Sequence, residues 1–376
     1  MYISGVGRTK FGNLSDNLQE LAYEAILNAL DDSNLDINEI GAIFVSNFLS
    51  GPLNGQLHLN SMISSLIPGI NIPIIRVETA CASSSVAFNQ AIYCLQNYSN
   101  ILIVGVEKMT GVGLLPTTDA ISMAGDRTYD FPNGLIFPAA YALIAQQYML
   151  KNNINHDILE LVSYINHQNS RLNPLAHFYY KEVSKEMIKN APMIASPLNL
   201  FDCSPISDGA VAVILSKNKT SDRDVKVMSS KIATDTISLT ERINLTSFIA
   251  TKIASKQAYK EAQITPADLD IIEIHDCFTI SELIALEDLG ICGASEVSEL
   301  IKNGDILRDG PFPVNTDGGL KANGHPIGAT GLAQIFEIVA QLRQETEKRQ
   351  VDNPEIGLAQ NIGGIGGTCG ITILGV

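Results

Sequence analysis

The amino-acid sequence follows one plan of helices and strands twice. In the first part of the chain, an apolar stripe predicts a helix over 18–30, and a polar turn separates it from a strand over 40–45. In the second part, the pattern predicts a helix over 254–262 and, after a polar turn, a strand over 271–274. The two copies share this layout but not their residues. The pattern therefore predicts an α/β protein of two related halves, and 376 residues exceed what one hydrophobic core comfortably holds.

The remaining segments assign most of the chain to one of the two halves. Four further apolar runs predict buried strands: 101–106, 210–215, 356–360 and 370–374. A polar turn at 220–224 divides the chain into an N-terminal half, 1–219, and a C-terminal half, 220–376. The region from about 109 to 196 fits neither copy and predicts a long excursion laid over the core. Its histidines follow no metal-ligand spacing, and we expect them at the surface: His156, His167 and His177.

Charge and cysteine content exclude several classes of function. The net charge of −15 disfavours nucleic-acid binding, because phosphates require an excess of Lys and Arg. The six cysteines are scattered, so we expect no disulfide framework and no metal site. No apolar run approaches the roughly 18–20 residues that cross a bilayer, and the N-terminus lacks the form of a signal peptide. We therefore expect a soluble cytoplasmic protein without a membrane segment.

Cys81 lies between a strand-like segment and a helix. An apolar run at 70–75 precedes it, and a stretch with helical periodicity follows it. Free backbone N–H groups and the positive end of a helix dipole favour the thiolate, which is the nucleophilic form. A lone cysteine among Ala and Ser residues is also an ordinary small core residue. A catalytic role for Cys81 therefore depends on the other motifs of the chain.

The motif His275-Asp276-Cys277-Phe278 directly follows a predicted buried strand. Titratable residues at the end of such a strand lie at the rim of an α/β sheet, where ligands bind. The alternative is structural: Asp276 would cap the next helix, and Cys277 would be a core residue.

A glycine-rich turn over 319–331 contains His325 and Pro326. Proline limits the conformations of the preceding residue, which helps to orient the imidazole ring. A histidine in a glycine turn at the start of a helix is poorly placed for core packing, which favours a functional role for His325.

A second glycine-rich turn, 361–367, includes Gly363 and offers backbone N–H donors of the kind that form an oxyanion hole. Only nine residues follow it, too few for the βαβ unit of a dinucleotide-binding site. The sequence therefore does not predict a nicotinamide or flavin enzyme.

Together these motifs resemble the thiolase superfamily, in order and spacing across nearly the whole chain. The His-Asp-Cys-Phe motif is similar to that of the sterol-carrier-protein-type and archaeal branch. The resemblance implies a five-layered αβαβα fold of two related halves, with a loop excursion in the first, and homodimers or homotetramers. Common thiolases carry Asn-Glu-Ala-Phe at the first motif and a catalytic cysteine where Asn361 stands here. The resemblance thus implies that Cys277 is the second catalytic thiol, and it leaves Cys369 as a structural residue.

The implied reaction is a reversible Claisen condensation of CoA thioesters, most simply acetyl-CoA to acetoacetyl-CoA for mevalonate and isoprenoid synthesis, without a cofactor. His325 would take the proton of Cys81, whose thiolate would form an acyl-enzyme. Cys277 would deprotonate the α-carbon of a second thioester, and a thiol with a pKa of about 8 suits this task. By resemblance, His275 and His325 would form one oxyanion hole. The backbone N–H groups of Cys81 and Gly363 would form the other.

Three alternatives remain open from the sequence. A ketoacyl or hydroxymethylglutaryl synthase of the same superfamily would use one cysteine, and Cys277 counts against it. A non-catalytic thiolase-like subunit would bind lipid or CoA, or serve as a scaffold. A cysteine protease receives no support from the duplicated layout. The acidic composition reveals no obvious basic CoA groove, so either a local basic patch that composition cannot show or a partner would attract CoA. It fits an association, known for archaeal relatives, with hydroxymethylglutaryl-CoA synthase and a small zinc-ribbon/OB-fold protein that helps to bind CoA.

Overall fold

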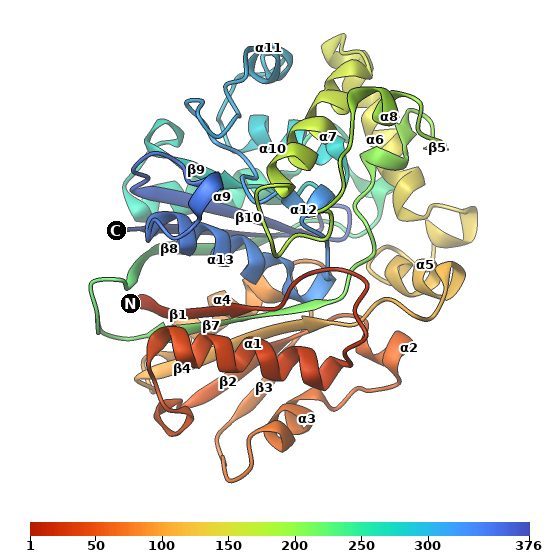
Figure 1. Ribbon diagram of the computed structural model, residues 1–376. Coiled ribbons are helices and arrows are strands. Elements are labelled where there is room, and N and C mark those ends of the chain that lie inside the picture. Colours follow the sequence, from red (N-terminus) through yellow and green to blue (C-terminus); the bar gives the residue numbers. More distant parts are fainter.

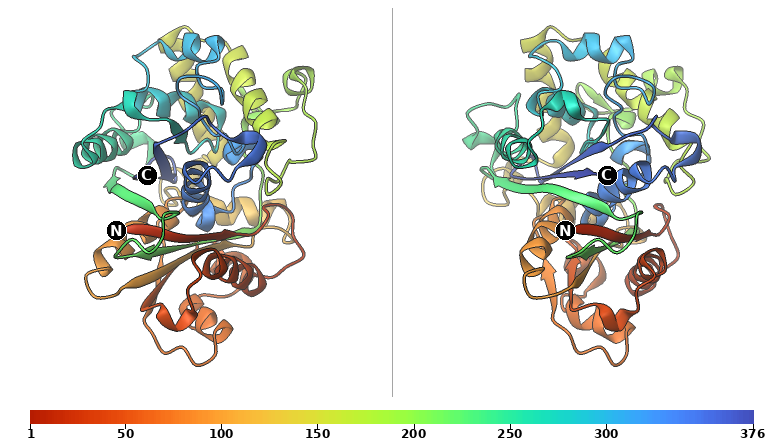
Figure 2. Two further views of the ribbon diagram at one scale, coloured as in Figure 1. Left: turned by 60° about the vertical axis from the view of Figure 1, so that its left-hand side comes forward. Right: turned by 90° about the vertical axis from the view of Figure 1, so that its left-hand side faces the viewer.

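Nine strands form one continuous hydrogen-bonded sheet in the computed structural model, which describes all residues from 1 to 376 (Figure 1). Their order is β3-β2-β4-β7-β1-β8-β11-β10-β9. The strands of the first half are β1 (Tyr2–Arg8), β2 (Ala42–Ser46), β3 (Ile74–Val77), β4 (Asn100–Glu107) and β7 (Gly209–Ser216). Those of the second half are β8 (Val225–Thr234), β9 (Ile271–Glu273), β10 (Ile356–Gly363) and β11 (Thr368–Gly375). Between the halves, β1 and β8 pair only at Tyr2 and Ile3, and the two parts of the sheet stack on each other (Figure 2).

The two parts of the sheet repeat one strand order about this junction. From the centre outward, the first half runs β1-β7-β4-β2 and the second runs β8-β11-β10-β9. The pairing sense matches as well: β4 pairs β7, and β10 pairs β11, in antiparallel fashion, whereas β2–β4 and β9–β10 are parallel. The duplicated layout that the sequence predicts is therefore present. The division at 219–220 falls in the loop between β7 and β8 and stays a prediction.

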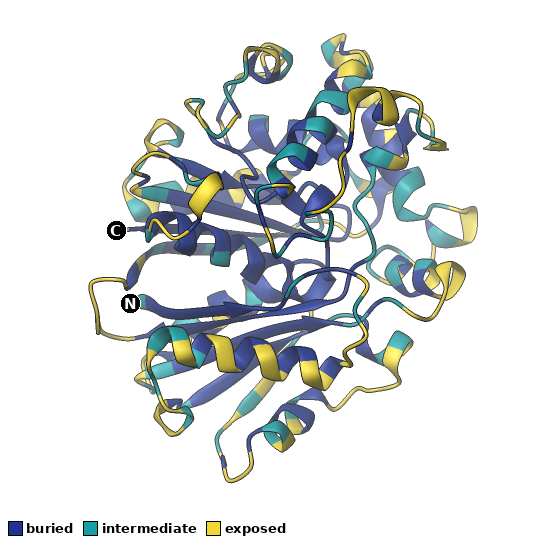
Figure 3. Cartoon of the chain, viewed as in Figure 1, coloured by how far each residue is buried: buried dark blue, intermediate teal, exposed yellow.

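Helices and sheet form five layers. The outer face of the first half carries α1 (Leu18–Ser33) and α3 (Leu59–Leu66), and the outer face of the second carries α9 (Ile249–Ala262) and α10 (Thr279–Asp288). Between the two parts of the sheet lie α4 (Ser83–Cys94) and α13 (Thr330–Leu342), which contact each other (Figures 1 and 2). Figure 3 shows α13 almost wholly buried, whereas α1 has an exposed outer stripe. The helix expected to follow the glycine-rich turn of His325 is thus α13 of the central layer.

Local sequence explains how these layers close. A Cβ atom on Gly7 of β1 would lie 2.3 Å from the backbone nitrogen of Ala29, so glycine allows α1 to lie against the strand. The same capped turn precedes the matching strands β2 and β9. Asp36 donates its N–H to Glu39 before β2, and Thr265 donates its N–H to Asp268 before β9. These turns, η1 (Ile37–Glu39) and η5 (Pro266–Asp268), fix where the two strands begin.

The excursion of the first half lies on the second half. It contains α5 (Leu114–Ser122), α6 (Phe137–Asn152), α7 (Asp157–Ser170), α8 (Lys185–Lys189) and a hairpin of β5 (Met193–Ala195) and β6 (Leu198–Asn199). Its helix α7 packs against α10, α11 (Val297–Asn303) and α12 (Gly319–Ala322). The other short elements are α2 (Ser50–Asn54), η1 (Ile37–Glu39), η2 (Phe131–Asn133), η3 (Leu200–Asp202), η4 (Leu239–Glu241), η5 (Pro266–Asp268), η6 (Ile327–Ala329) and η7 (Glu347–Arg349).

The structure overturns the expectation that the histidines of the excursion lie at the surface. His167 is 1% exposed, donates from Nδ1 to the carbonyl of Ser163 and stacks on Phe178. His156 is partly buried and hydrogen-bonds to Asp202 at 3.0 Å. His177 is also partly buried and lies 2.9 Å from the hydroxyl of Ser207. The expectation is wrong because the histidines contact other segments of the first half, such as Phe201 and Asp202, which the sequence spacing does not reveal.

Two strands next to the junction are absent from the sequence prediction. In β1, the glycines and Ser4 interrupt the apolar pattern, and in β8 the serines and lysines do so. Both strands are fixed by pairing partners far away in the chain, since β1 pairs β7 and β8 pairs β11. No helix of the protein combines the length and apolarity that a bilayer crossing requires.

Candidate active site

Cys81 lies in a tight turn between β3 and α4. Ala80 adopts a positive φ of 54°, a strained conformation for a residue with a side chain. Ser83 holds the turn closed, because its Oγ accepts the N–H of Thr79 at 2.9 Å and donates to the carbonyl of Ala80. The turn places the Cys81 thiol just before the helix, 6% exposed. The predicted location of Cys81 at a helix start is confirmed.

His275 and Cys277 follow the end of β9, at the rim of the sheet. The backbone N–H of His275 donates to Oε1 of Gln360 at 2.9 Å, which ties the segment to β10. Asp276 does not cap α10, whose N-cap is Phe278 without a side-chain cap. Its carboxylate instead accepts the N–H groups of Leu320 and Lys321, at the start of α12. The structural alternative for Asp276 is therefore wrong, and Asp276 links the first motif to the turn that carries His325.

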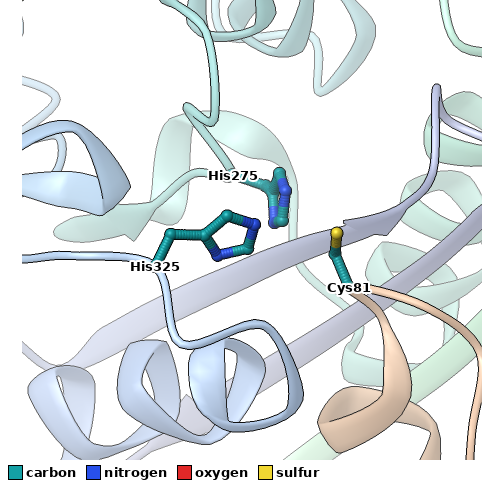
Figure 4. Close-up of side chains that lie close together, drawn as sticks. All are labelled: Cys81, His275 and His325. Carbon is teal, nitrogen blue, oxygen red and sulfur yellow. The ribbon is translucent and has the colours of Figure 1, made fainter. Parts of the chain in front are cut away.

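His325 lies between α12 and η6, and it is buried together with its turn. Its Nδ1 is 2.7 Å from the hydroxyl of Thr330. That hydroxyl donates its one proton to the carbonyl of Pro326 at 3.0 Å, so it must accept from Nδ1–H. A neutral imidazole carries one N–H, which leaves Nε2 as a free base. Figure 4 shows a ring nitrogen of His325 on the side of His275 and Cys81.

The fold brings these three side chains into one buried cluster. One donor atom each of Cys81, His275 and His325 lies within 4.8 Å of the others. The two imidazole rings stand nearly perpendicular, at 88° with centroids 5.1 Å apart (Figure 4). Cys81 comes from the first half of the chain, whereas both histidines come from the second. The sequence motifs that predicted a joint site therefore do meet.

Cys277 and the terminal glycine turn border the cluster. The Cys277 sulfur lies 3.8 Å from the hydroxyl of Ser281, and Cys277 is among the groups that act on the pKa of Cys81. Gly363 ends β10, and a Cβ atom there would lie 2.5 Å from the carbonyl of Thr79 in the Cys81 turn. Glycine at this position lets β10 approach that turn closely. The N–H of the next residue, Gly364, acts on the Cys81 sulfur and lowers its pKa.

Burial dominates the protonation of the cluster. Burial, followed by the neighbouring Cys277, raises the pKa of Cys81 far above its ordinary value, and burial raises the pKa of Cys277 to about 12. Burial lowers the pKa of His325 to about 3. The expectations of a thiolate at Cys81 and of an ordinary pKa near 8 at Cys277 are therefore wrong for the resting site. Both effects have one cause, since a site without water penalises charged forms.

Tyr141 is a site residue that the sequence did not reveal. It comes from α6 of the excursion, is fully buried and donates its hydroxyl to the carbonyl of Gly364 at 3.2 Å. The same hydroxyl acts on Cys277 and lowers the pKa of that thiol. Its ring stacks on Phe278 with centroids 4.4 Å apart. No local pattern marks Tyr141, because its partners belong to the second half.

The same cluster offers a metal-ligand set that sequence spacing could not show. A thiolate and two imidazoles are ligands that zinc prefers, and here tertiary structure brings them together. The sequence argument against a metal considered only neighbouring positions such as His275 and Cys277. The expected absence of a resident metal stays a prediction.

Comparisons with known proteins agree with this geometry. The family described as "Thiolase, N-terminal domain" matches residues 1–219, and "Thiolase C-terminal domain-like" matches 232–376. The acetyl-CoA acetyltransferase of Methanothermobacter thermautotrophicus is 42% identical over 99% of this chain and 98% of its own. Sterol carrier protein 2 of Homo sapiens is 30% identical over 99% of this chain and 71% of its own. Among solved structures, Ltp2-ChsH2(DUF35) aldolase has a TM-score of 0.86 at 22% identity, covering 100% of this chain and 97% of that one.

Proposed function

Because the chain belongs to the thiolase family and is an acyltransferase, we propose that it joins two molecules of acetyl-CoA into acetoacetyl-CoA through an acyl-enzyme on Cys81. The observation that carries the proposal is the buried cluster of Cys81, His275 and His325, with Cys277 at its border. The full-length similarity to an acetyl-CoA acetyltransferase supports acetyl groups as the substrate class.

In the first step, Cys81 takes up the acetyl group. Nε2 of His325 accepts the Sγ proton while the sulfur attacks the thioester carbonyl. The tetrahedral intermediate collapses, the C–S bond to CoA breaks, and the leaving sulfur takes the proton back from His325. Since burial raises the pKa of Cys81 and lowers that of His325, a charged pair is scarce at rest. Proton transfer is therefore coupled to attack, with the backbone N–H groups at Cys81 and in the 363–364 turn facing the developing oxyanion.

In the second step, Nε2 of His325 accepts the Sγ proton of Cys277, and the resulting thiolate removes a proton from the α-carbon of another acetyl thioester. The enolate oxygen receives hydrogen bonds from Nε2–H of His275 and from the proton that His325 now holds on Nε2, and the α-carbon attacks the acyl carbon on Cys81. A C–C bond forms, the bond from the acyl carbon to Cys81 breaks, the Cys81 sulfur takes the proton from His325, and acetoacetyl-CoA leaves. A thiol with a pKa of about 12 gives a strong base once ionised, and the hydroxyls of Tyr141 and Ser281 stabilise that thiolate.

The residues of the cluster also distinguish a thiolase from a ketoacyl-synthase-type enzyme and from a non-catalytic subunit of the same superfamily. A ketoacyl-synthase-type enzyme would require only the cysteine and the two histidines, which this site also contains. The second buried thiol at Cys277 favours the two-thiol reaction. A non-catalytic subunit has no need for any of the four groups.

We also propose that a partner protein helps to bind CoA. CoA carries phosphates, whereas this chain has a net charge of −15, so the attraction has to come from a local patch or from another chain. The aldolase of similar fold is described as Ltp2-ChsH2(DUF35), a name that joins it to a second component. A zinc-ribbon/OB-fold partner, association with hydroxymethylglutaryl-CoA synthase, a role in mevalonate synthesis and a cytoplasmic homodimer or homotetramer stay predictions.

The direct test is acetylation by acetyl-CoA, followed by mass spectrometry of the digested protein. The wild-type protein should carry an acetyl group on Cys81, and Cys81→Ala should carry none. Cys94→Ala, which removes a partly exposed thiol at the end of α4, should label like the wild type. A folded wild-type protein that neither labels nor cleaves acetoacetyl-CoA with CoA would contradict the proposal and favour a non-catalytic subunit.

A further inference from the structure

Asn361 on β10 lies directly behind one of the two histidines of the cluster. Its Nδ2 is 2.9 Å from Nδ1 of His275, and both side chains are buried. We infer that Asn361 is a positioning residue that holds His275 in the tautomer with its proton on Nε2. The consequence of this tautomer for catalysis rests on the proposed function.

The hydrogen-bond inventory determines the tautomer. An amide nitrogen donates and cannot accept, so Nδ1 of His275 must be the acceptor. Because Nδ1 accepts a hydrogen bond, the ring is not the doubly protonated imidazolium, so it is neutral and carries a single proton; burial and the neighbouring His325, which lower the pKa of His275, favour the same form. That proton is therefore on Nε2. This atom is buried and has no hydrogen-bond partner, so it is a donor available to the site.

The surroundings of Asn361 hold the amide in place. A Cβ atom on Gly331 would lie 2.6 Å from Oδ1 of Asn361 and 2.9 Å from Oγ of Ser84. Glycine at 331 thus leaves room for the amide between α4 and α13. The Ser84 hydroxyl accepts the N–H of Leu332. The amide nitrogen faces His275, whereas the amide oxygen faces Gly331 and has no hydrogen-bond partner.

The two histidines therefore carry their single protons on different ring nitrogens. Thr330 leaves His325 with a free lone pair on Nε2, and Asn361 leaves His275 with a proton on Nε2. The site needs both, because one ring has to accept the thiol proton and the other has to donate to an oxyanion. Two lone pairs would repel the oxyanion, and two N–H groups would leave no base. The two histidines thus perform different tasks, because His325 is hydrogen-bonded to Thr330 and His275 to Asn361.

Nitrogen NMR of histidine-labelled protein tests this assignment, because the two imidazole nitrogens have distinct shifts in each tautomer. The chain has six histidines, and His275→Gln identifies the signals of His275 by their loss. The wild-type protein should show the Nε2–H tautomer at His275. A wild-type protein with the proton on Nδ1 would overturn the inference without any Asn361 variant, so folding of a variant is not required.

The Asn361→Asp variant reverses the interaction. A carboxylate accepts hydrogen bonds, so it should draw the His275 proton to Nδ1 and reverse the NMR signature. Loss of the Nε2–H donor should then lower kcat on the order of 10²-fold with little change in KM. Asn89→Asp is the matched control, because Asn89 is a buried asparagine of α4 that donates to the carbonyl of Ser230. This control should leave the His275 signals unchanged.

The NMR and kinetic outcomes are separable. An Asn361→Asp protein with an unchanged His275 tautomer contradicts the positioning role, whatever its activity. A wild-type protein with the Nε2–H tautomer but no acetyl transfer leaves the positioning role intact and contradicts the proposed function.

Discussion

The two halves of the molecule share one scaffold and divide the chemistry unequally. In the first half, the turn before α4 presents Cys81; in the second, the turn before α13 presents His325. These equivalent helices lie side by side in the central layer, so both turns open toward one site. Duplication thus places the proposed nucleophile and its proposed base at matching positions of two copies.

The next pair of matching positions differs in kind. The segment after β9 carries His275 and Cys277, whereas the segment after β2 begins with Asn47, which donates to Glu107. Glu107 also accepts the backbone N–H groups of Leu49 and, from the other half, Gly328 in the His325 turn. The first half therefore uses this position to support the base, and the second uses it to supply a donor and a thiol. The segments after β2 and β9 thus occupy matching positions in the fold but carry different functional groups.

The largest expected effect comes from removing the base of the second half while the nucleophile of the first half stays intact. His325→Asn should lower both acetylation of Cys81 and condensation by about 10³-fold, because no other group takes the thiol proton. Single-turnover acetylation and steady-state assays measure the two steps. His58→Asn, at the exposed start of α3, should retain wild-type rates. A His325→Asn protein that acetylates at the wild-type rate would show that the first half activates its own thiol.

A smaller effect should come from Tyr141, which joins the excursion of the first half to the thiol of the second. Tyr141→Phe removes a hydroxyl that lowers the pKa of Cys277, so condensation should slow about tenfold while acetylation of Cys81 changes little. Tyr148→Phe on the same helix is the matched control. It loses a hydrogen bond to Glu287 at 2.6 Å and should cost about 1 kcal/mol of stability without slowing condensation. Equal slowing of both variants would assign Tyr141 a purely structural role.

The smallest effect concerns the pH dependence of stability in the second half. Burial, followed by the charge of Asp276, raises the pKa of Glu282 to about 8, so the folded protein keeps a proton that the unfolded chain has lost. The free energy of unfolding should therefore fall as pH rises from about 5 to about 8. Glu282→Gln should remove on the order of 1 kcal/mol of this decrease for each pH unit, as measured by urea unfolding across that range.

Two results would decide this stability prediction. Glu299→Gln changes an exposed carboxyl group of α11 and should leave the pH dependence as in the wild type. A Glu282→Gln protein whose unfolding free energy falls as steeply as that of the wild type would contradict the assignment of the proton to Glu282.

The sequence predicted what local patterns encode. The helical stripe of α1, the apolar run of β4 and the turns around Cys81 and His325 each lie within one short segment, and the structure has them where expected. The resemblance to thiolases and their five-layered fold is confirmed as well. The catalytic roles of the site residues stay predictions.

The features that the sequence missed depend on distant partners. β1 pairs β7, more than 200 residues away, and His167 is buried against Phe201, 34 positions along the chain. The protonation of Cys81 follows from burial by elements of both halves, and the hydrogen bond of Asn361 to His275 spans 86 positions. Local propensity cannot encode such pairings, because it describes each segment without its neighbours in space.

The most direct test of the divided chemistry is Cys277→Ala incubated with acetyl-CoA, with mass spectrometry of the protein and assay of acetoacetyl-CoA. The first half should still take up an acetyl group on Cys81, and that acyl-enzyme should accumulate because the base for the second thioester is missing. Wild-type protein should label and also form product. Formation of acetoacetyl-CoA by Cys277→Ala at the wild-type rate would contradict the account.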